Sequence, residues 1–210
     1  MTPARGSLRT FADPDALAEG AAAFLCDQAE RSHDRFVLAL SGGSTPKRLY
    51  QRLGASPFVK RFPWSRTQFV IGDERFVPPD HPDSNFRMIR EAMFAHVPVP
   101  PGNIHPVPTE GLDADAAAAA YDRTLRHLYG ADALEADKPL FDVCLLGLGE
   151  DGHTASLIPG QPVLEERTKW VAAVPAGRAE VRITLTYPAL ESSHATIFLV
   201  EGEKKRAILD

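Results

Sequence analysis

Short apolar runs that end at glycine or polar residues constrain the fold of this chain most. The segments 35–40, 67–71 and 141–146 each read as a short, largely apolar strand. Strands of this kind are typical of parallel sheets whose faces are covered by helices. The segments with helical spacing or helix-capping residues are 13–32, 47–53, 84–96 and 113–129. Because strands and helices alternate, we expect an α/β fold with an open, mostly parallel sheet.

The rest of the chain extends this alternation. We expect further strands at 169–174, 181–185 and 195–200, an irregular proline-rich loop at 97–108, and a last helix from Glu203 to Asp210. With 210 residues, of which 44% are hydrophobic, the chain is long enough to bury a sizeable core. No repeat or linker divides residues 1–210, so we expect a single domain.

Composition and charge exclude several classes of function. A formal net charge of -5 disfavours a surface for nucleic acid or anionic membranes. Cys26 and Cys144 lie in apolar patterns and are expected as buried thiols, and no Cys/His spacing typical of a metal site is present. The chain has neither a long apolar run nor a signal peptide. We therefore expect a cytoplasmic protein without membrane or nucleic-acid partners.

Three polar turns follow the first three predicted strands. They are Ser41–Thr45, Asp73–Arg75 and Gly147–Thr154. In open α/β folds, ligands bind beyond the carboxyl ends of the parallel strands. We therefore expect the three turns to meet at one rim of the sheet and to form the functional site.

The first turn is suited to binding an anion. Gly42 and Gly43 permit close approach of the backbone, and Ser44 and Thr45 add hydroxyls next to a predicted helix N-terminus. The spacing is not that of a P-loop. This pattern indicates a phosphate or carboxylate cradle, and the alternative is an ordinary Ser/Thr cap.

The third turn has the G-x-G-x-x-G spacing of a dinucleotide site, at Gly147, Gly149 and Gly152. A dinucleotide site also needs a long helix and an acidic residue about 20 positions further on. Pro159 interrupts any such helix, and no carboxylate lies near Trp170. These two departures disfavour a nicotinamide site, and a tight turn with a solvated histidine remains the alternative.

His153 is the best candidate for a general base. Of the seven histidines, it alone follows a glycine-rich turn after an apolar strand, with Asp151 two residues before it. A neutral imidazole accepts protons effectively near neutral pH. No G-x-S-x-G nucleophile motif is present, which favours attack by activated water over an acyl-enzyme.

The charges of Asp73, Glu74 and Arg75 are costly to bury, so we expect all three to face the rim. Arg75 would then hold an anion or a developing oxyanion. The alternative is a solvated loop with an internal ion pair.

Four stretches together resemble the 6-phosphogluconolactonase family. They are SGGSTP at 41–46, GDERFVP at 72–78 with DSN at 83–85, GLGEDGHTASLIPG at 147–160 and RITLT at 182–186. They occur in the family's order and span most of the chain. The resemblance implies hydrolysis of 6-phospho-D-glucono-1,5-lactone without a metal or an organic cofactor. It also implies a three-layer α/β/α, modified Rossmann-like fold of the sugar-phosphate isomerase type.

The resemblance further implies roles for single residues. His153 corresponds to the family's general base and Arg75 to its charge-stabilising arginine. The Ser41–Thr45 turn, Arg182 and Lys205 correspond to its phosphate site, and Lys205 is preferred to Lys204 because it stands three residues after Gly202. Either Asp151 or Asp73 orients His153 or a sugar hydroxyl, and the residues leave that choice open.

Two other functions are weighed against this one. Glucosamine-6-phosphate deaminases share the cradle and an Asp-Gly-His turn, but they have Asp-Glu-Tyr where this chain has Asp73-Glu74-Arg75. They also carry an Asn-Glu-Pro where this chain has Ser156-Leu157-Ile158-Pro159. A non-catalytic sugar-phosphate sensor is disfavoured by the presence of Arg75 and His153. Relatives continue past the last predicted helix, so a missing C-terminal end is a further expectation.

Overall fold

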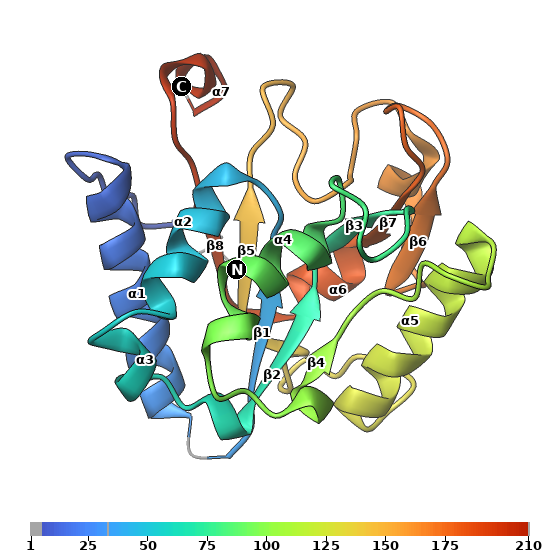
Figure 1. The fold of residues 1–210 in the computed structure, drawn as a ribbon. Coiled ribbons are helices and arrows are strands. Elements are labelled where there is room, and N and C mark those ends of the chain that lie inside the picture. The colour runs from blue at the N-terminus through green and yellow to red at the C-terminus, as the bar shows by residue number, and fades with distance from the viewer. Residues whose placement is uncertain (1–5, 33, 210) are drawn as a thin grey trace.

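The computed structural model describes residues 6–32 and 34–209. Its main sheet has five parallel strands in the order β4-β2-β1-β5-β8. The strands are β1 (Phe36–Leu40), β2 (Thr67–Ile71), β4 (Ile104–His105), β5 (Phe141–Gly147) and β8 (Ser193–Leu199). In Figure 1 the arrows of β1, β2 and β5 point to the top of the molecule, so their carboxyl ends share one edge. The expected parallel α/β sheet is thereby confirmed.

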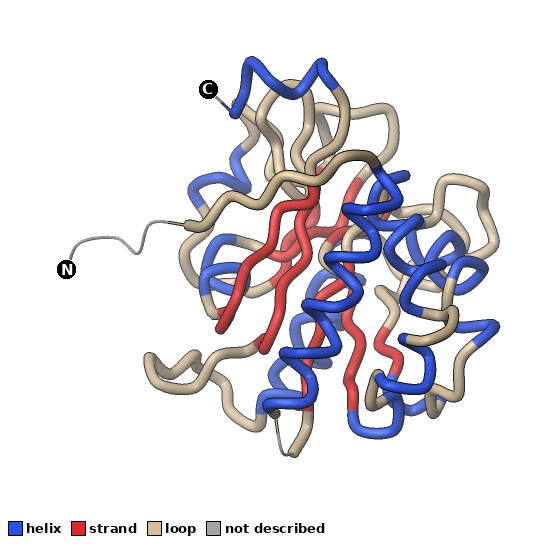
Figure 2. The backbone as a smooth tube through the Cα atoms, turned by 90° about the vertical axis from the view of Figure 1, so that its left-hand side faces the viewer, coloured by secondary structure: helices blue, strands red, loops and turns tan. Residues whose placement is uncertain are grey.

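Helices lie on both sides of this sheet (Figures 1 and 2). They are α1 (Pro14–Arg31), α2 (Ser44–Leu53), α3 (Phe58–Arg61), α4 (Asn85–Ala92), α5 (Ala114–Tyr129), α6 (Tyr187–Glu191) and α7 (Arg206–Leu209). Asp13, Ser84 and Asp113 cap α1, α4 and α5 by accepting a hydrogen bond from a backbone N–H. Gly130 ends α5 in the left-handed conformation. Local capping chemistry therefore sets these boundaries.

A second sheet of three antiparallel strands lies beside the first. Its order is β3-β7-β6, with β3 (Asp73–Arg75), β7 (Arg182–Leu185) and β6 (Val171–Val174). The strands at 169–174 and 181–185 were expected, but Asp73–Arg75 is a strand and not a turn. It pairs with β7 over its whole length. A polar segment of three residues has no sequence pattern that would predict this pairing.

Gly72 joins the two sheets. Its N–H donates to the carbonyl of Leu40 in β1, and its carbonyl accepts from the N–H of Leu185 in β7, both at 2.8 Å. A Cβ at this position would lie 3.1 Å from the Leu40 carbonyl oxygen, so the close approach leaves little room for a side chain. The backbone at Gly72 thus brings the end of β2 to the edge of β7.

The core explains why the apolar runs form strands. All five residues of β1 and four consecutive residues of β5, Val143–Leu146, are buried, as expected for strands covered on both faces. In β8 the residues alternate between exposed and partly buried up to Phe198, as at a sheet edge. Cys26 and Cys144 are free and buried, as expected, and burial raises the pKa of the Cys144 thiol to about 12.

Some predicted boundaries are wrong. Helix α4 stops at Ala92 and a 3-10 turn covers Phe94–His96, while the proline-rich loop contains β4. The last helix is a 3-10 turn at Glu203–Lys205 followed by α7; Asp210 lies outside the described residues. Further 3-10 turns cover Trp64–Arg66, Pro101–Asn103 and Pro162–Glu165. In the described ranges, no helix combines the length and apolar character needed to cross a membrane.

Candidate active site

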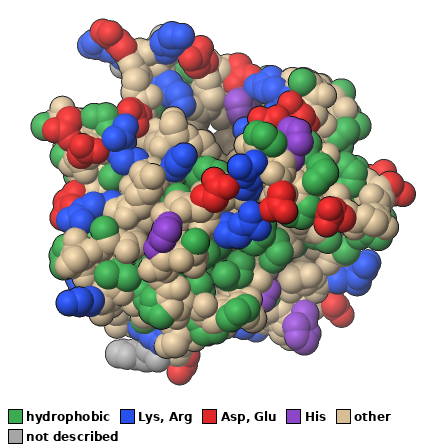
Figure 3. All heavy atoms as spheres, viewed as in Figure 1, with side chains coloured by type: hydrophobic (Ala, Val, Ile, Leu, Met, Phe, Trp, Pro, Cys, Tyr) green, Lys and Arg blue, Asp and Glu red, His purple; other side chains and the backbone are tan. Residues whose placement is uncertain are grey.

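The polar turns after β1 and β5 and the strand β3 meet around one cavity at the carboxyl edge of the main sheet. The cavity is about 280 Å³ in volume. All of the predicted site residues except Asp151 line it: Gly42, Gly43, Ser44, Thr45, Asp73, Arg75, His153, Arg182 and Lys205. Figure 3 shows a hollow in the upper part of the molecule, with basic side chains and a histidine beside it. The expected convergence at one rim is therefore present.

The cradle is the N-terminus of α2. This helix begins at Ser44, earlier than expected, with Gly43 at its N-cap in a positive-φ conformation (φ 110°). No side chain caps the helix, so the alternative of an ordinary Ser/Thr cap does not hold. The first backbone N–H groups of a helix have no intrahelical partner, and the helix dipole favours an anion there. The N-terminus of α2 can therefore receive a phosphate.

Tyr50 fixes the start of this cradle. Its buried hydroxyl accepts from the N–H of Ser41 at 2.9 Å and donates to the carbonyl of Ser41 at 2.7 Å. Because Tyr50 lies on α2, the two bonds tie the end of β1 to the helix whose N-terminus faces the cavity.

Gly42 is required for a different reason than expected. A Cβ at Gly42 would overlap with the side-chain amide of Asn85, a buried residue that also lines the cavity. Asn85 donates from Nδ2 to the carbonyl of Asp73 at 2.8 Å. Gly42 therefore leaves room for Asn85, a residue of the DSN stretch to which the sequence assigned no role.

Strand β3 presents two charges to the cavity and hides the third. Asp73 and Arg75 line the cavity, whereas Glu74 is buried on the opposite face, because successive residues of a strand point to opposite sides. The Glu74 carboxylate accepts from the N–H groups of Asn85 and Phe86, both at 2.7 Å, at the start of α4. Burial raises the pKa of Glu74, and these bonds oppose the rise. The expectation that all three charges face the rim is thus wrong for Glu74.

Arg75 and Arg182 face each other across the pairing of β3 with β7. The Nε atoms of both are buried and lack a hydrogen-bond partner among the described residues. Arg75 donates to the carbonyl of Asp83 at 2.6 Å, and Arg182 to the carboxylate of Glu180 at 3.1 Å. Burial, and after it the charge of Arg75, lower the pKa of Arg182. Like charges directly opposite are unfavourable, so this pair would be stabilised by an anion in the cavity.

Asp73 is held by Ser156 and not by His153. Its Oδ2 accepts from the Ser156 hydroxyl at 2.7 Å, while the Ser156 N–H donates to the hydroxyl of Thr184 at 3.1 Å. All three residues are buried. The loop after β5 is thereby fastened to both β3 and β7.

Asp151 is the carboxylate that contacts His153. Its Oδ1 lies 2.5 Å from His153 Nδ1, which indicates the tautomer with the proton on Nδ1 and a lone pair on Nε2. A Cβ at Gly149 would overlap with the imidazole, so this glycine makes room for the ring. The choice between Asp73 and Asp151 as the partner of His153, open in the sequence, thus falls on Asp151 in the structure.

Arg178 is a third member of this group. Its Nη2 lies 2.6 Å from Asp151 Oδ2 and 3.0 Å from His153 Nδ1. First Arg178 and then His153 hold the pKa of the Asp151 carboxyl well below its usual range. Sequence reasoning missed Arg178 because it stands far along the chain from the turn it contacts, with no motif to link them.

Lys205 and Lys204 differ in their position relative to the cavity, in agreement with the preference for Lys205. Lys205 is partly buried and lines the cavity, whereas Lys204 is exposed, 3.9 Å from the Glu150 carboxylate. In the described part of the chain, no three His, Cys, Asp or Glu side chains are grouped so as to hold a metal ion. The cavity thus combines one imidazole with three cationic side chains.

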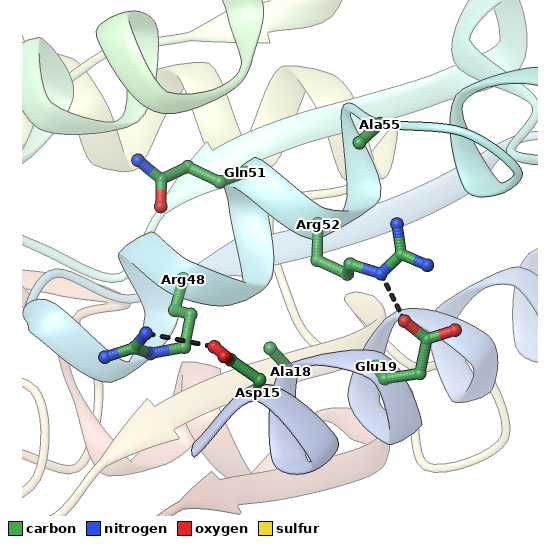
Figure 4. Close-up of a pocket in the computed structure, with 7 residues that line it drawn as sticks. All are labelled: Asp15, Ala18, Glu19, Arg48, Gln51, Arg52 and Ala55. Carbon is green, nitrogen blue, oxygen red and sulfur yellow. Dashed lines mark hydrogen bonds and ion pairs between the residues drawn. The ribbon is translucent and has the colours of Figure 1, made fainter.

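A second cavity lies between α1 and α2 and is lined by charged pairs (Figure 4). It measures about 310 Å³, slightly more than the first. Arg48 pairs with Asp15 at 3.0 Å, and Arg52 pairs with Glu19. Its cations are already neutralised and it contains no histidine, so the chemistry favours the rim cavity as the candidate site.

Comparisons with known proteins identify the family of this chain. Residues 12–210 match the family model described as glucosamine-6-phosphate isomerases/6-phosphogluconolactonase. A 6-phosphogluconolactonase of Nostoc sp. is 41% identical over 87% of this chain and 73% of its own length. The Arabidopsis thaliana protein named 6-phosphogluconolactonase 3, chloroplastic, is 39% identical over 86% of this chain, but the match spans only 57% of that relative. The structure of 6-phosphogluconolactonase from Trypanosoma cruzi is similar, with a TM-score of 0.84 and 30% identity over 95% of this chain and 82% of that one.

Proposed function

The chain belongs to the family of glucosamine-6-phosphate isomerases and 6-phosphogluconolactonases, and from this membership we propose that it hydrolyses 6-phospho-D-glucono-1,5-lactone to 6-phosphogluconate. Its relatives in Nostoc sp. and Trypanosoma cruzi carry the name of this activity. The substrate has an anionic phosphate at one end and a reactive ester at the other. The rim cavity offers one group of residues for each end.

The phosphate is held by the cradle and by two side chains. The N-terminus of α2 supplies backbone N–H groups and the hydroxyls of Ser44 and Thr45, and Arg182 and Lys205 supply positive charge. Fixing the phosphate places the lactone ring, so that the attack on its carbonyl becomes effectively intramolecular.

The reaction needs one base and one stabiliser of charge. His153 Nε2 accepts a proton from a water molecule while the water oxygen bonds to C1 of the lactone. Arg75 stabilises the oxyanion of the tetrahedral intermediate. The C1–ring oxygen bond then breaks, His153 returns its proton to the departing ring oxygen, and the product carries a hydroxyl and a carboxyl group. In this mechanism Asp151 accepts from the Nδ1–H of the resting imidazole, whose Nδ1 lies 2.5 Å from Oδ1.

A single observation carries the proposal: two facing arginines share a cavity with an oriented histidine. Arg75 and Arg182 lie opposite each other in the pairing of β3 with β7, and both line the cavity that His153 also lines. Two like charges beside one cavity favour an anionic ligand. A sugar-phosphate ester satisfies both arginines, with its phosphate for Arg182 and its developing oxyanion for Arg75.

The test compares two substrates with the same purified protein. We expect acid release from freshly made 6-phosphogluconolactone, above its spontaneous hydrolysis, and no ammonia release from glucosamine 6-phosphate. Ammonia release without lactone hydrolysis would assign the chain to the deaminase activity. Binding of 6-phosphogluconate with neither reaction would leave a sugar-phosphate sensor.

A further inference from the structure

Arg178 contacts the catalytic group without being part of the cavity wall. It lies on the loop between β6 and β7, in a chain segment separate from the turn that carries His153. Its side chain is about one third exposed, at 33%. An ion pair with that exposure contributes little to the free energy of unfolding. Its main effect is therefore on the positions of the side chains that it joins.

The carboxylate of Asp151 bridges Arg178 and His153. One oxygen, Oδ2, accepts from Arg178 at 2.6 Å, and the other, Oδ1, faces His153 Nδ1 at 2.5 Å. Arg178 Nη2 also lies 3.0 Å from Nδ1, but a guanidinium has only donors, so the nearer Asp151 oxygen is the group that can accept the Nδ1 proton. With Oδ2 held, rotation of the carboxylate is restricted and Oδ1 stays directed at the ring.

The loop that carries Arg178 is itself anchored. Gly177 has a φ of 92° and packs against the segment that follows the catalytic turn, where a Cβ would lie 3.1 Å from both Ile158 and Gln161. Arg178 Nη1 also donates to the carbonyl of Gly177 at 2.8 Å. These contacts place the Arg178 guanidinium beside Asp151.

We propose that Arg178 is a positioning residue of the reaction, which acts through Asp151 to keep His153 in the Nδ1–H tautomer with Nε2 free to accept the proton of water. This assignment rests on the proposed function for its catalytic meaning. The contacts that carry it involve no substrate, so it can also be tested in the free protein.

The kinetic test uses Arg178→Gln, Arg178→Lys and Arg90→Gln. We expect Arg178→Gln to lower kcat by roughly 10- to 100-fold while KM changes little, since misplacement of a catalytic group acts on the chemical step. Arg178→Lys should recover part of this loss because it retains a cation. Arg90→Gln is the matched control: Arg90 forms a similar exposed pair with Asp80, at 2.7 Å, and does not line the cavity.

The structural test is ¹⁵N NMR of the His153 ring in the substrate-free protein. We expect the Nδ1–H tautomer in the wild type and a mixture of tautomers in a folded Arg178→Gln variant. Either an unchanged kcat or an unchanged tautomer in that variant overturns the proposal, and a rise in KM alone would assign Arg178 to substrate binding. Failure of the proposed function is distinguishable, because it would appear as absent lactone hydrolysis in the wild type.

Discussion

At the scale of single residues, His153 and its neighbours decide whether water is activated. In the proposed mechanism, His153→Ala removes the base but leaves the cradle and both arginines in place. We expect kcat to fall by about 10²–10⁴-fold with KM nearly unchanged. Initial rates of acid release, corrected for spontaneous hydrolysis, measure this effect. Near-wild-type turnover in a variant with native circular dichroism would exclude His153 as the base.

The facing arginines give a prediction that links stability to ligand. Arg182→Met removes one of two like charges that lie opposite each other, so we expect a gain of about 0.2–1 kcal/mol in the free energy of unfolding. The same change should raise KM and reduce the rise in Tm that we expect inorganic phosphate to produce in the wild type. Thermal unfolding with and without phosphate measures both effects. Equal phosphate stabilisation in the two proteins would contradict the role of Arg182.

The charge of Asp151 predicts how activity depends on pH. Arg178 and His153 lower the pKa of this carboxyl in the folded state. The ionised form of Asp151 therefore stabilises the folded protein. That contribution is present above the unfolded pKa, near 4, and is lost only as the pH falls through the lower folded value. Asp151 thus stays ionised between about pH 5 and 8. We expect Asp151→Asn to lower kcat but to retain the fall of kcat/KM at acid pH. Loss of that fall in the variant would show that Asp151 itself titrates in this pH range.

At the scale of elements, two tyrosine hydroxyls fasten the ends of neighbouring strands. Tyr50 holds the backbone of Ser41 after β1, and Tyr121 on α5 holds the N–H and carbonyl of Ile71 at the end of β2. Both hydroxyls are buried. Each therefore joins a helix to the rim from which the site is built.

This symmetry provides a matched pair of variants. We expect Tyr50→Phe and Tyr121→Phe each to lower the free energy of unfolding by about 1–3 kcal/mol, because buried backbone groups lose their partner. Tyr50→Phe should in addition raise KM more than Tyr121→Phe, since only Tyr50 lies on the helix that forms the cradle. Denaturant unfolding and steady-state kinetics measure the two effects. Equal KM values for both variants would show that the clamp on Ser41 does not shape the cradle.

Elements with strong local signals could be predicted from the sequence. The apolar runs of β1, β2 and β5, the Ser84 cap of α4 and the helical patterns of α1 and α5 identified most of the fold. Strands β3 and β4 are short and polar or proline-flanked, and only their pairing partners make them strands. The inward direction of Glu74 depends on the pairing of β3, and the contact of Arg178 with Asp151 joins segments far apart in the chain, so neither had a local signal.

At the scale of the whole molecule, the site lies where two sheets of different kinds meet. The parallel sheet contributes the cradle after β1 and the His153 turn after β5, and the antiparallel sheet contributes Arg75 and Arg182. A chain with a net charge of -5 thus concentrates positive charge in one cavity. The sequence predicted this meeting of three turns from topology, but not that a second sheet supplies the arginine pair.

The alternation of Asp73, Glu74 and Arg75 about strand β3 has a consequence for the length of this segment. Each side chain has a different environment. Asp73 accepts from the Ser156 hydroxyl, Glu74 binds the start of α4, and Arg75 lines the cavity beside Arg182. A one-residue deletion after Gly72 would turn the Glu74 carboxylate toward the anion site and the Arg75 guanidinium toward α4, and an insertion would likewise move every side chain to the opposite face. The length of this segment is therefore as constrained as its three side chains, and we expect a one-residue insertion after Gly72 to abolish lactone hydrolysis.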